Sequence, residues 1–303
     1  MQAFPKYVDI DTINTCNARC TMCGIDFDHR TDRRMDQALF DKIVDELAQR
    51  RDDVERVGLA VNCEPLMDRS LHEKVAQLRA AGIDRTFIFT NGSLLSERRT
   101  TELIEAGLDC VYVSIDSIDP ERYEAIRAGL RFETVYANTL RLLEIKAALR
   151  PRTTVRIAMV EQPDRPGEGD AFVEHWKPLL GPGDQVSVTR AYNWGIAQSV
   201  VDCDDGVRAA VNRVPCLGLW TSLVVDVGGE VRMCCADEAG VTEVGNLSEQ
   251  SIAEVWGGPA MSAIRQRHLD GRRHELALCD GCPVWDADKH RLRYDAPSVP
   301  DAS

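Results

Sequence analysis

Apolar and polar positions follow a repeating strand-then-helix rhythm along the first two thirds of the chain. Short apolar runs typical of buried strands occur at residues 7–13, 54–61, 85–90, 110–115, 153–160 and 185–190. Helical spacing separates them at 36–50, 70–81, 96–106, 120–128, 134–149 and 169–180. Gly82 and Gly107 stand where two of these helices should end. The alternation predicts an α/β fold, a partial (β/α)6 TIM-type barrel with its chemistry near the strand C-termini.

The rhythm changes after about residue 195. Residues 222–227 and 230–233 flank Gly228-Gly229, which predicts a two-residue hairpin. An amphipathic helix is expected over 251–269, followed by a Cys-x2-Cys loop and a polar, proline-containing end. We therefore expect three parts: a barrel over 1–199, a small cysteine-rich domain over 200–288 and a loose polar tail over 289–303.

Charge and composition exclude several classes of protein. The formal net charge is −13 and no basic stripe is visible, which argues against nucleic-acid binding. No apolar run approaches the roughly 18 residues that span a bilayer, and the first residues lack a secretory pattern. We therefore expect a cytoplasmic, reducing environment without membrane contact. There, eleven cysteines indicate metal binding or catalysis rather than disulfides.

Three of these cysteines, Cys16, Cys20 and Cys23, directly follow the first expected strand. Three thiolates can hold three irons of a four-iron cluster and leave the fourth iron open to a ligand. A structural zinc site requires four protein ligands, and His29 is near enough in sequence to be the fourth. The spacing favours the iron–sulfur cluster, with zinc as the alternative.

The segment from Cys16 to Cys23 resembles the cluster motif of the radical S-adenosylmethionine (radical SAM) superfamily. The resemblance implies that the open iron binds the amino and carboxylate groups of S-adenosylmethionine. Reductive cleavage then gives a 5′-deoxyadenosyl radical. An electron donor such as flavodoxin or ferredoxin is implied as a partner.

Further motifs follow the later strands in the order that this family shows. Asn62-Cys63-Glu64-Pro65 resembles the Gly-Gly-Glu-Pro motif of this family, with both glycines replaced. The resemblance implies only that Glu64 contacts the methionine amino group. The resemblance implies that Arg127 contacts the methionine carboxylate. Other implied cofactor contacts are Asn91, Ser114, Asp116 and Asn193. Singly, each motif also fits an ordinary turn or surface charge; their order favours the cofactor role.

A second cysteine set lies in the last third of the chain: Cys216, Cys234, Cys279 and Cys282. Four thiolates suit structural zinc and a four-iron cluster equally well. The pattern Cys-x12-Gly-x4-Cys followed by Cys-x2-Cys resembles the SPASM domain. Because no cysteine follows Cys282, it is similar to the shortened "twitch" version, which has one auxiliary cluster. The implied cofactors are two 4Fe-4S clusters and S-adenosylmethionine.

Within the twitch branch, the chain resembles dehydrogenases of the deoxy-scyllo-inosamine type and epimerases of aminoglycoside antibiotic biosynthesis. A start close to the first strand, a single auxiliary cluster and the acidic charge favour this group over peptide-modifying relatives. The implied reaction removes hydrogen from a secondary alcohol carbon of an aminocyclitol or amino sugar.

The fate of the product radical is left open between two outcomes. We favour epimerisation, in which a thiol returns a hydrogen atom; Cys203 is the first candidate for this donor and Cys235 the second. Dehydrogenation to a ketone, with the auxiliary cluster as electron acceptor, is the alternative. Peptide modification and a non-catalytic zinc module are the remaining hypotheses.

Overall fold

The computed structural model describes residues 3–25, 31–149, 152–191, 205–237, 240–282 and 291–295. The strands are β1 (Tyr7–Ile10), β2 (Arg19–Cys20), β3 (Arg56–Gly58), β4 (Thr86–Thr90), β5 (Cys110–Ser114), β6 (Arg127–Ala128), β7 (Thr154–Glu161), β8 (Gln185–Arg190), β9 (Ser222–Val225), β10 (Glu230–Arg232), β11 (Glu243–Asn246) and β12 (Arg291–Asp295). The α-helices are α1 (Gln37–Gln49), α2 (Leu71–Ala80), α3 (Glu97–Ala106), α4 (Pro120–Ile126), α5 (Phe132–Leu149), α6 (Glu168–Trp176), α7 (Asp205–Val211), α8 (Ile252–Trp256) and α9 (Pro259–Leu269). Four short 3-10 helices accompany them: η1 (Pro65–Met67), η2 (Lys177–Leu179), η3 (Leu217–Trp220) and η4 (Arg273–Glu275).

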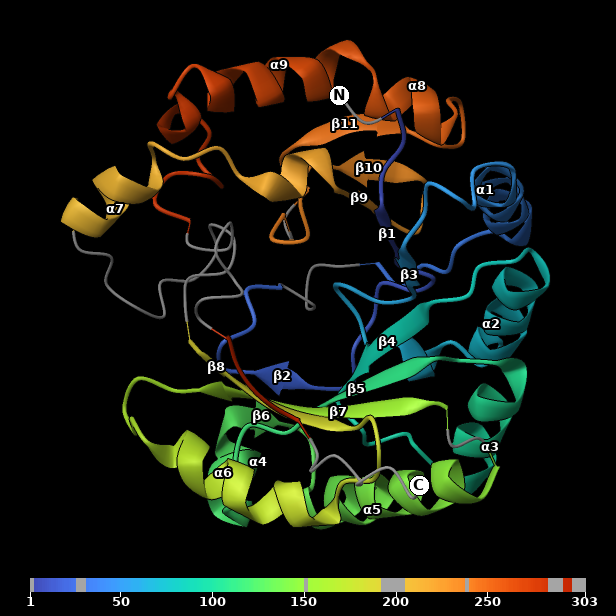
Figure 1. Ribbon diagram of the computed structural model, residues 1–303, viewed down its shortest axis with the longest axis vertical. Helices are drawn as coiled ribbons and strands as arrows, with labels where there is room; N and C mark the ends of the chain where they lie inside the picture. Colours follow the sequence, from blue (N-terminus) through green and yellow to red (C-terminus); the bar gives the residue numbers. More distant parts are fainter. Residues whose placement is uncertain are drawn as a thin grey trace, which may run out of the picture.

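Ten of the strands form one sheet in the order β11-β10-β9-β1-β3-β4-β5-β7-β8-β12. Strands β1, β3, β4, β5, β7 and β8 pair in parallel with one another. The sheet curves, and α1 to α6 cover its outer side (Figure 1). This confirms the predicted α/β fold with a partial (β/α)6 arrangement, and the described strands leave the sheet open between β11 and β12.

The hydrophobic core lies between this sheet and the outer helices. On β7, Val155, Ile157 and Met159 are buried, whereas the alternate residues are half-buried on the inner face. Helix α1 meets the sheet with Phe40, Ile43, Val44 and Leu47 at helical spacing. Burying one such side chain contributes about 1.5–3 kcal/mol. The inner face of the sheet is therefore packed less completely than the outer face, and a barrel of this kind can receive ligands there.

The cysteine-rich part of the chain, which carries β9, β10 and β11, continues the same sheet. Strand β9 pairs with β1 in parallel, from Tyr7 opposite Ser222 to Ile10 opposite Val225. β10 returns antiparallel to β9 through the predicted hairpin, whose Gly229 has a φ of +88°. Helices α8 and α9 lie beside β10 and β11 (Figure 1). The expected boundary at residue 200 lies outside the described residues, so the division into domains stays a prediction.

Two predicted helices were too long. The helix expected over 251–269 is two helices, because Gly257 and Gly258 interrupt it and Pro259 starts α9 at a position where a missing N–H costs nothing. The helix expected over 120–128 ends at Ile126 instead. Arg127 and Ala128 leave it to pair with Cys20 and Arg19, and this pairing brings the helix end to the first cysteine loop.

Part of the chain predicted to be a loose tail is ordered into a strand. β12 (Arg291–Asp295) pairs antiparallel with β8 over five residue pairs. The prediction of a tail over 289–303 was therefore wrong for these residues. This strand was not predicted because the segment is polar and its partner strand is distant in sequence. Hydrophobic periodicity does not report such a contact.

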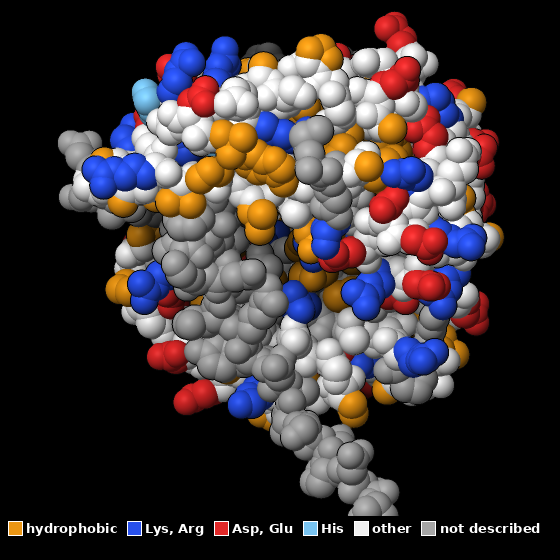
Figure 2. Space-filling view, turned by 45° about the horizontal axis from the view of Figure 1, so that its top comes forward, with side chains coloured by type: hydrophobic (Ala, Val, Ile, Leu, Met, Phe, Trp, Pro, Cys, Tyr) orange, Lys and Arg blue, Asp and Glu red, His pale blue; other side chains and the backbone are white. Residues whose placement is uncertain are grey.

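On the face shown in Figure 2, Lys and Arg side chains are interspersed with Asp and Glu. No helix within the described ranges is both long and apolar enough to cross a membrane.

Candidate active site

The first cysteine loop follows β1 and is held from the side by the segment after α4. β2 pairs with β6 in a two-stranded ladder, and Thr21 N donates to Ile126 O at 2.9 Å. Gly129, at φ +94°, lets its backbone approach Asn17, since a Cβ there would lie 3.3 Å from Asn17 O. This pairing fixes the loop that carries all three cysteines.

The three thiols share a half-buried environment. Burial raises the pKa of Cys16 to about 11, and the negative charges of Glu64, Cys20 and Cys23 add to the effect. Burial also raises the pKa of Cys20, against the opposing influence of Arg127. Three thiolates this close together would repel one another, and a bound metal centre would neutralise that repulsion. The donor set therefore fits an iron–sulfur cluster with three protein ligands.

Glu64 joins the ends of β3 and β4 close to this loop and is 2% exposed. Its carboxylate accepts hydrogen bonds from Thr90 Oγ1 at 2.7 Å and from Asn91 N at 2.7 Å. Leu66 N donates to it at 3.1 Å. Burial raises the pKa of Glu64, and these hydrogen bonds oppose that increase. The structure thus gives Glu64 a positioning role; its predicted contact to an amino group stays a prediction.

Asn91 links the strand ends to the cysteine loop. Its Nδ2 donates to Asn17 Oδ1 at 2.9 Å and lies 4.0 Å from Cys16 Sγ. Ser93 closes the network by donating to Asn91 Oδ1 at 2.7 Å and accepting from Asn17 Nδ2 at 2.9 Å. Sequence reasoning selected Asn91 but missed Asn17 and Ser93, although Asn17 lies inside the cysteine motif itself.

Arg127 approaches the same site from β6 in a buried ion pair. Its Nε donates to Asp116 Oδ2 at 2.7 Å, and its Nη1 lies 3.8 Å from Cys20 Sγ. Asp116 is fully buried and also accepts from Val160 N at 2.8 Å. Asp116 therefore holds Arg127 against the cysteine loop, while its predicted contact to the ribose or methionyl end remains a prediction.

Other predicted residues lie around this centre or outside the described ranges. Ser114 is half-buried at the end of β5. Cys63 is half-buried, and its Sγ lies 3.6 Å from Asp11 Oδ1. Asn193, Cys203 and His29 lie outside the described residues. The structure thus brings Glu64, Asn91, Asp116 and Arg127 together with the first cysteine set, and it leaves the roles of Asn193 and Cys203 as predictions.

The second cysteine set converges from three segments of the chain. Cys216 precedes η3, Cys234 follows β10, and Cys279 and Cys282 share one tight loop. Burial raises the pKa of Cys279 to about 12, and the charges of Cys234, Cys282 and Cys216 contribute in the same direction. The four thiols therefore influence one another electrostatically, and their role as ligands of one cluster stays a prediction.

Backbone and side-chain contacts shape the loop between Cys279 and Cys282. Asn212 donates to Asp280 Oδ1 at 2.7 Å and accepts from Gly281 N at 2.9 Å. Gly281 has a φ of +68°, which a residue with a Cβ rarely adopts. No three His, Cys, Asp or Glu side chains in the described part are arranged for a single metal ion. A four-iron cluster does not require such a group, because it distributes its thiolates over separate irons.

Cys235 adjoins this second set in sequence, directly after Cys234, and is half-buried. Its thiol hydrogen-bonds to Cys234, and together with burial this raises the pKa of Cys235 well above its ordinary value. The charges of Asp9 and Cys282 act in the same direction. The Cys235 thiol therefore interacts electrostatically with both the second cysteine set and Asp9 of β1.

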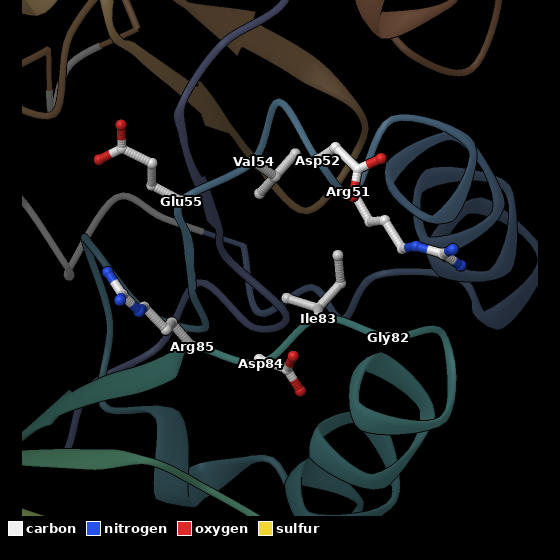
Figure 3. Close-up of a pocket in the computed structure, with 8 residues that line it drawn as sticks. All are labelled: Arg51, Asp52, Val54, Glu55, Gly82, Ile83, Asp84 and Arg85. Carbon is white, nitrogen blue, oxygen red and sulfur yellow. The ribbon is translucent and has the colours of Figure 1, made fainter.

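A separate pocket of about 370 Å³ opens at the opposite end of the strands. It is lined by the residues that precede β3 and β4, including Arg51, Asp52, Glu55 and Asp84, and Ile83 points toward Val54 within it (Figure 3). The cysteine loops follow the C-terminal ends of strands. This pocket is therefore distinct from the candidate active site.

Two family models match the chain. The radical SAM superfamily model covers residues 10–165, just over half of the chain. A model of an iron–sulfur cluster-binding domain, SPASM, covers residues 216–283. The chain belongs to the radical SAM superfamily. Its cofactors are S-adenosylmethionine with a four-iron cluster, which the first cysteine set fits, and an auxiliary iron–sulfur cluster, which the second set fits.

Individual relatives place this radical SAM protein more finely. A GTP 3′,8-cyclase of Chlorobaculum tepidum is 33% identical over 169 residues, 55% of this chain and 49% of that relative. The chain spans no more than about half the length of the first curated relatives that it matches. An S-adenosyl-L-methionine-dependent 2-deoxy-scyllo-inosamine dehydrogenase of Niallia circulans is 23% identical over 281 residues, 91% of each chain.

A solved structure shows the same fold over nearly the whole chain. The crystal structure of BtrN in complex with AdoMet and 2-DOIA superposes with a TM-score of 0.61 at 21% identity, covering 93% of this chain and 94% of that one. At this identity the likeness establishes the fold. It confirms that the barrel and the cysteine-rich part belong to one architecture.

Proposed function

We propose that this radical SAM enzyme removes a hydrogen atom from a secondary alcohol carbon of an aminocyclitol or amino sugar, as in aminoglycoside antibiotic biosynthesis. The observation that carries the proposal is the match to 2-deoxy-scyllo-inosamine dehydrogenase, which extends over 91% of both chains, whereas the cyclases match only part of their length. The net charge of −13 would also steer a cationic substrate toward the protein.

When bound, S-adenosylmethionine and the first cluster supply the 5′-deoxyadenosyl radical that takes up the hydrogen atom. The residues of this chain hold the reactants in place. Cys16, Cys20 and Cys23 would ligate three irons of the first cluster, and Arg127 lies beside Cys20 with its charge balanced by Asp116. Because its other guanidinium nitrogens extend past this ion pair, Arg127 is suited to bind a carboxylate of the cofactor.

The inner face of the sheet offers a carboxylate for an amino group of the substrate. Asp9 on β1 is half-buried on the face opposite the core residues Val8 and Ile10. Gly58 on the adjacent β3 leaves room for it, since a Cβ at Gly58 would lie 2.3 Å from Asp9 Oδ1. A carboxylate in such a site can accept charge-assisted hydrogen bonds from an ammonium group.

For the fate of the substrate radical we favour epimerisation with a thiol as hydrogen donor. The S–H bond breaks, a new C–H bond forms on the opposite face of the carbon, and an electron and a proton must then restore the thiol. Cys203 stays the first candidate for the donor and lies outside the described residues. Cys235 is the second candidate, and its thiol interacts electrostatically with Asp9, the carboxylate proposed to bind the substrate.

Oxidation of the same carbinol to a ketone is the second candidate outcome. The name of the Niallia circulans relative, a dehydrogenase, favours it. In that case the carbon radical would lose an electron, for which the auxiliary cluster would be the acceptor, and a proton to a base, and no thiol is needed. Peptide modification is a weaker third hypothesis, because the full-length relative is named for an aminocyclitol substrate.

The decisive experiment is product analysis after anaerobic reconstitution, with S-adenosylmethionine, a reductant and a panel of aminocyclitols and amino sugars. We expect substrate-dependent 5′-deoxyadenosine and, in heavy water, an epimer with one solvent deuteron at carbon. A ketone from native enzyme and from Cys235→Ala and Cys203→Ala variants alike would rule out epimerisation. If no panel member stimulates 5′-deoxyadenosine formation and a peptide does, the substrate class is wrong.

A further inference from the structure

Arg273 lies in η4, six residues before Cys279, and is 1% exposed. Its guanidinium donates to the backbone carbonyls of Cys279 at 3.1 Å and Cys282 at 3.0 Å. It also donates to the carbonyls of Val211 at 3.1 Å and Val214 at 2.9 Å. One side chain therefore binds four backbone oxygens in the interior of the cysteine-rich part.

These four carbonyls belong to two separate arms of the second cysteine site. Val211 and Val214 lie directly before Cys216, whereas Cys279 and Cys282 are ligands in the other arm. The arms are far apart in sequence, and the planar guanidinium is rigid enough to fix their separation. A lysine could not reproduce this contact, because one ammonium group cannot bind four carbonyls in a fixed plane.

Within the part of the chain that the structure describes, the charge of Arg273 meets backbone carbonyls rather than carboxylates. No Asp or Glu of the described residues lies within ion-pair distance of it, although Arg127 and Arg232 each have one. Burying an uncompensated charge is costly, and carbonyl dipoles offset only part of that cost. Two of the carbonyls that Arg273 binds belong to Cys279 and Cys282, so the buried guanidinium lies directly beside the second cysteine set.

A cluster held by four thiolates carries negative charge, which grows by one unit on reduction. A fixed positive charge nearby stabilises the reduced form more than the oxidised form, and buried charge and hydrogen bonding are known determinants of cluster potential. We propose that Arg273 is the buried counter-ion of the auxiliary cluster, joining its two ligand arms and raising its reduction potential. This role depends on the iron–sulfur assignment of the second cysteine set and is independent of the substrate proposed above.

Full-length protein with Cys16, Cys20 and Cys23 replaced by alanine retains only the auxiliary site, so its redox titration reports on that cluster alone. In this background we would compare Arg273→Gln, Arg273→Lys and the control Arg265→Gln. Arg265 is also buried and donates to the carbonyls of Leu219 and Trp256, neither of which is a cysteine of the second set. Iron content and the midpoint potential, followed by electron paramagnetic resonance, are measured without substrate.

We expect Arg273→Gln to lower the midpoint potential by at least about 59 mV. This corresponds to a tenfold change in the equilibrium constant for one-electron reduction. Arg273→Lys should lose iron more readily than the parent while its loaded fraction keeps a potential near the parent value. An unchanged potential in Arg273→Gln, or an equal shift in Arg265→Gln, would overturn the proposal. If Arg273→Gln binds no iron, the iron content of Arg273→Lys, which keeps the positive charge, becomes the test. An iron content as low in Arg273→Lys as in Arg273→Gln would exclude the counter-ion role.

Discussion

The two cysteine sites are built in different ways. The first places three thiols on a single short loop and fixes that loop through side chains that follow successive strands, mainly the Asn91 network and the Arg127–Asp116 pair. The second collects four thiols from three segments and fixes them through backbone carbonyls bound by Arg273. Three thiols would leave one iron of a four-iron cluster open, and polar groups that can contact a ligand lie beside the first site. Four thiols would supply a ligand to every iron, which would suit the second site to a structural or electron-transfer role.

Removing the ligands of each site should produce the largest and most different effects. Replacing Cys16, Cys20 and Cys23 by alanine should abolish 5′-deoxyadenosine formation and lower iron from about eight to about four per chain. Replacing Cys279 and Cys282 should lower iron equally but leave some cleavage of S-adenosylmethionine, uncoupled from product. Iron analysis and chromatography of 5′-deoxyadenosine measure both. Cleavage that survives in the first variant, or is absent from the second, would contradict this division of roles.

The ion pair beside the first site should be a major contributor to stability. Arg127→Met leaves Asp116 buried without its partner, which we expect to cost about 3–5 kcal/mol in the free energy of unfolding of the metal-free protein. Arg131→Met is a matched control: Arg131 bonds Glu124 at the same 2.7 Å distance, yet its side chain is 76% exposed against 10% for Arg127. The control should cost about 0.2–1 kcal/mol. Similar losses in a urea titration would show that burial does not matter here.

Asp9, on the inner face near Cys235, should make stability depend on pH. Burial raises its pKa to about 7 in the folded protein, whereas an unfolded Asp titrates near 3.9. Between about pH 4 and pH 7 the folded state therefore binds more protons, so stability falls as pH rises through this window. We expect Asp9→Asn to be more stable than the parent at pH 8 by about 1–4 kcal/mol, with no difference near pH 4.

Urea titrations of the metal-free protein at several pH values measure this difference. Asn in place of the exposed Asp45 on α1 serves as the surface control. A constant difference between Asp9→Asn and the parent across the pH range would contradict the buried-carboxylate explanation.

Much of this architecture could be predicted from the sequence, because the signals are local. Strand β8 matches its predicted range, and Gly82 and Gly107 end their helices with φ of +83° and +100°. The cysteine spacings and Arg127 were also visible, because each lies in a short motif after a strand. These features depend on neighbours in sequence, which periodicity and spacing report directly.

The remaining features depend on contacts between distant segments. Nothing around Arg273 distinguishes it from a surface arginine until the chain folds and brings Val211, Val214 and the Cys279 loop to it. β12 was missed for the same reason, since its partner β8 lies about a hundred residues earlier. Helix 251–269 was an error of local chemistry, because the Gly-Gly-Pro interruption was in plain view.

The smallest expected effect concerns an exposed ion pair beside the second cysteine set, and it tests whether this pair holds the ligand loop as firmly as the buried Arg273. Arg208 pairs with Asp280 at 2.9 Å between the two ligands Cys279 and Cys282, but their side chains are 45% and 30% exposed. Exposed pairs contribute about 0.2–1 kcal/mol and are screened by salt. Arg208→Ala should therefore cost at most about 1 kcal/mol, with the difference vanishing in 1 M salt, and should leave iron content unchanged. Loss of iron in Arg208→Ala comparable with that in Arg273→Gln would mean that α7, rather than the buried guanidinium, holds the ligand loop in place.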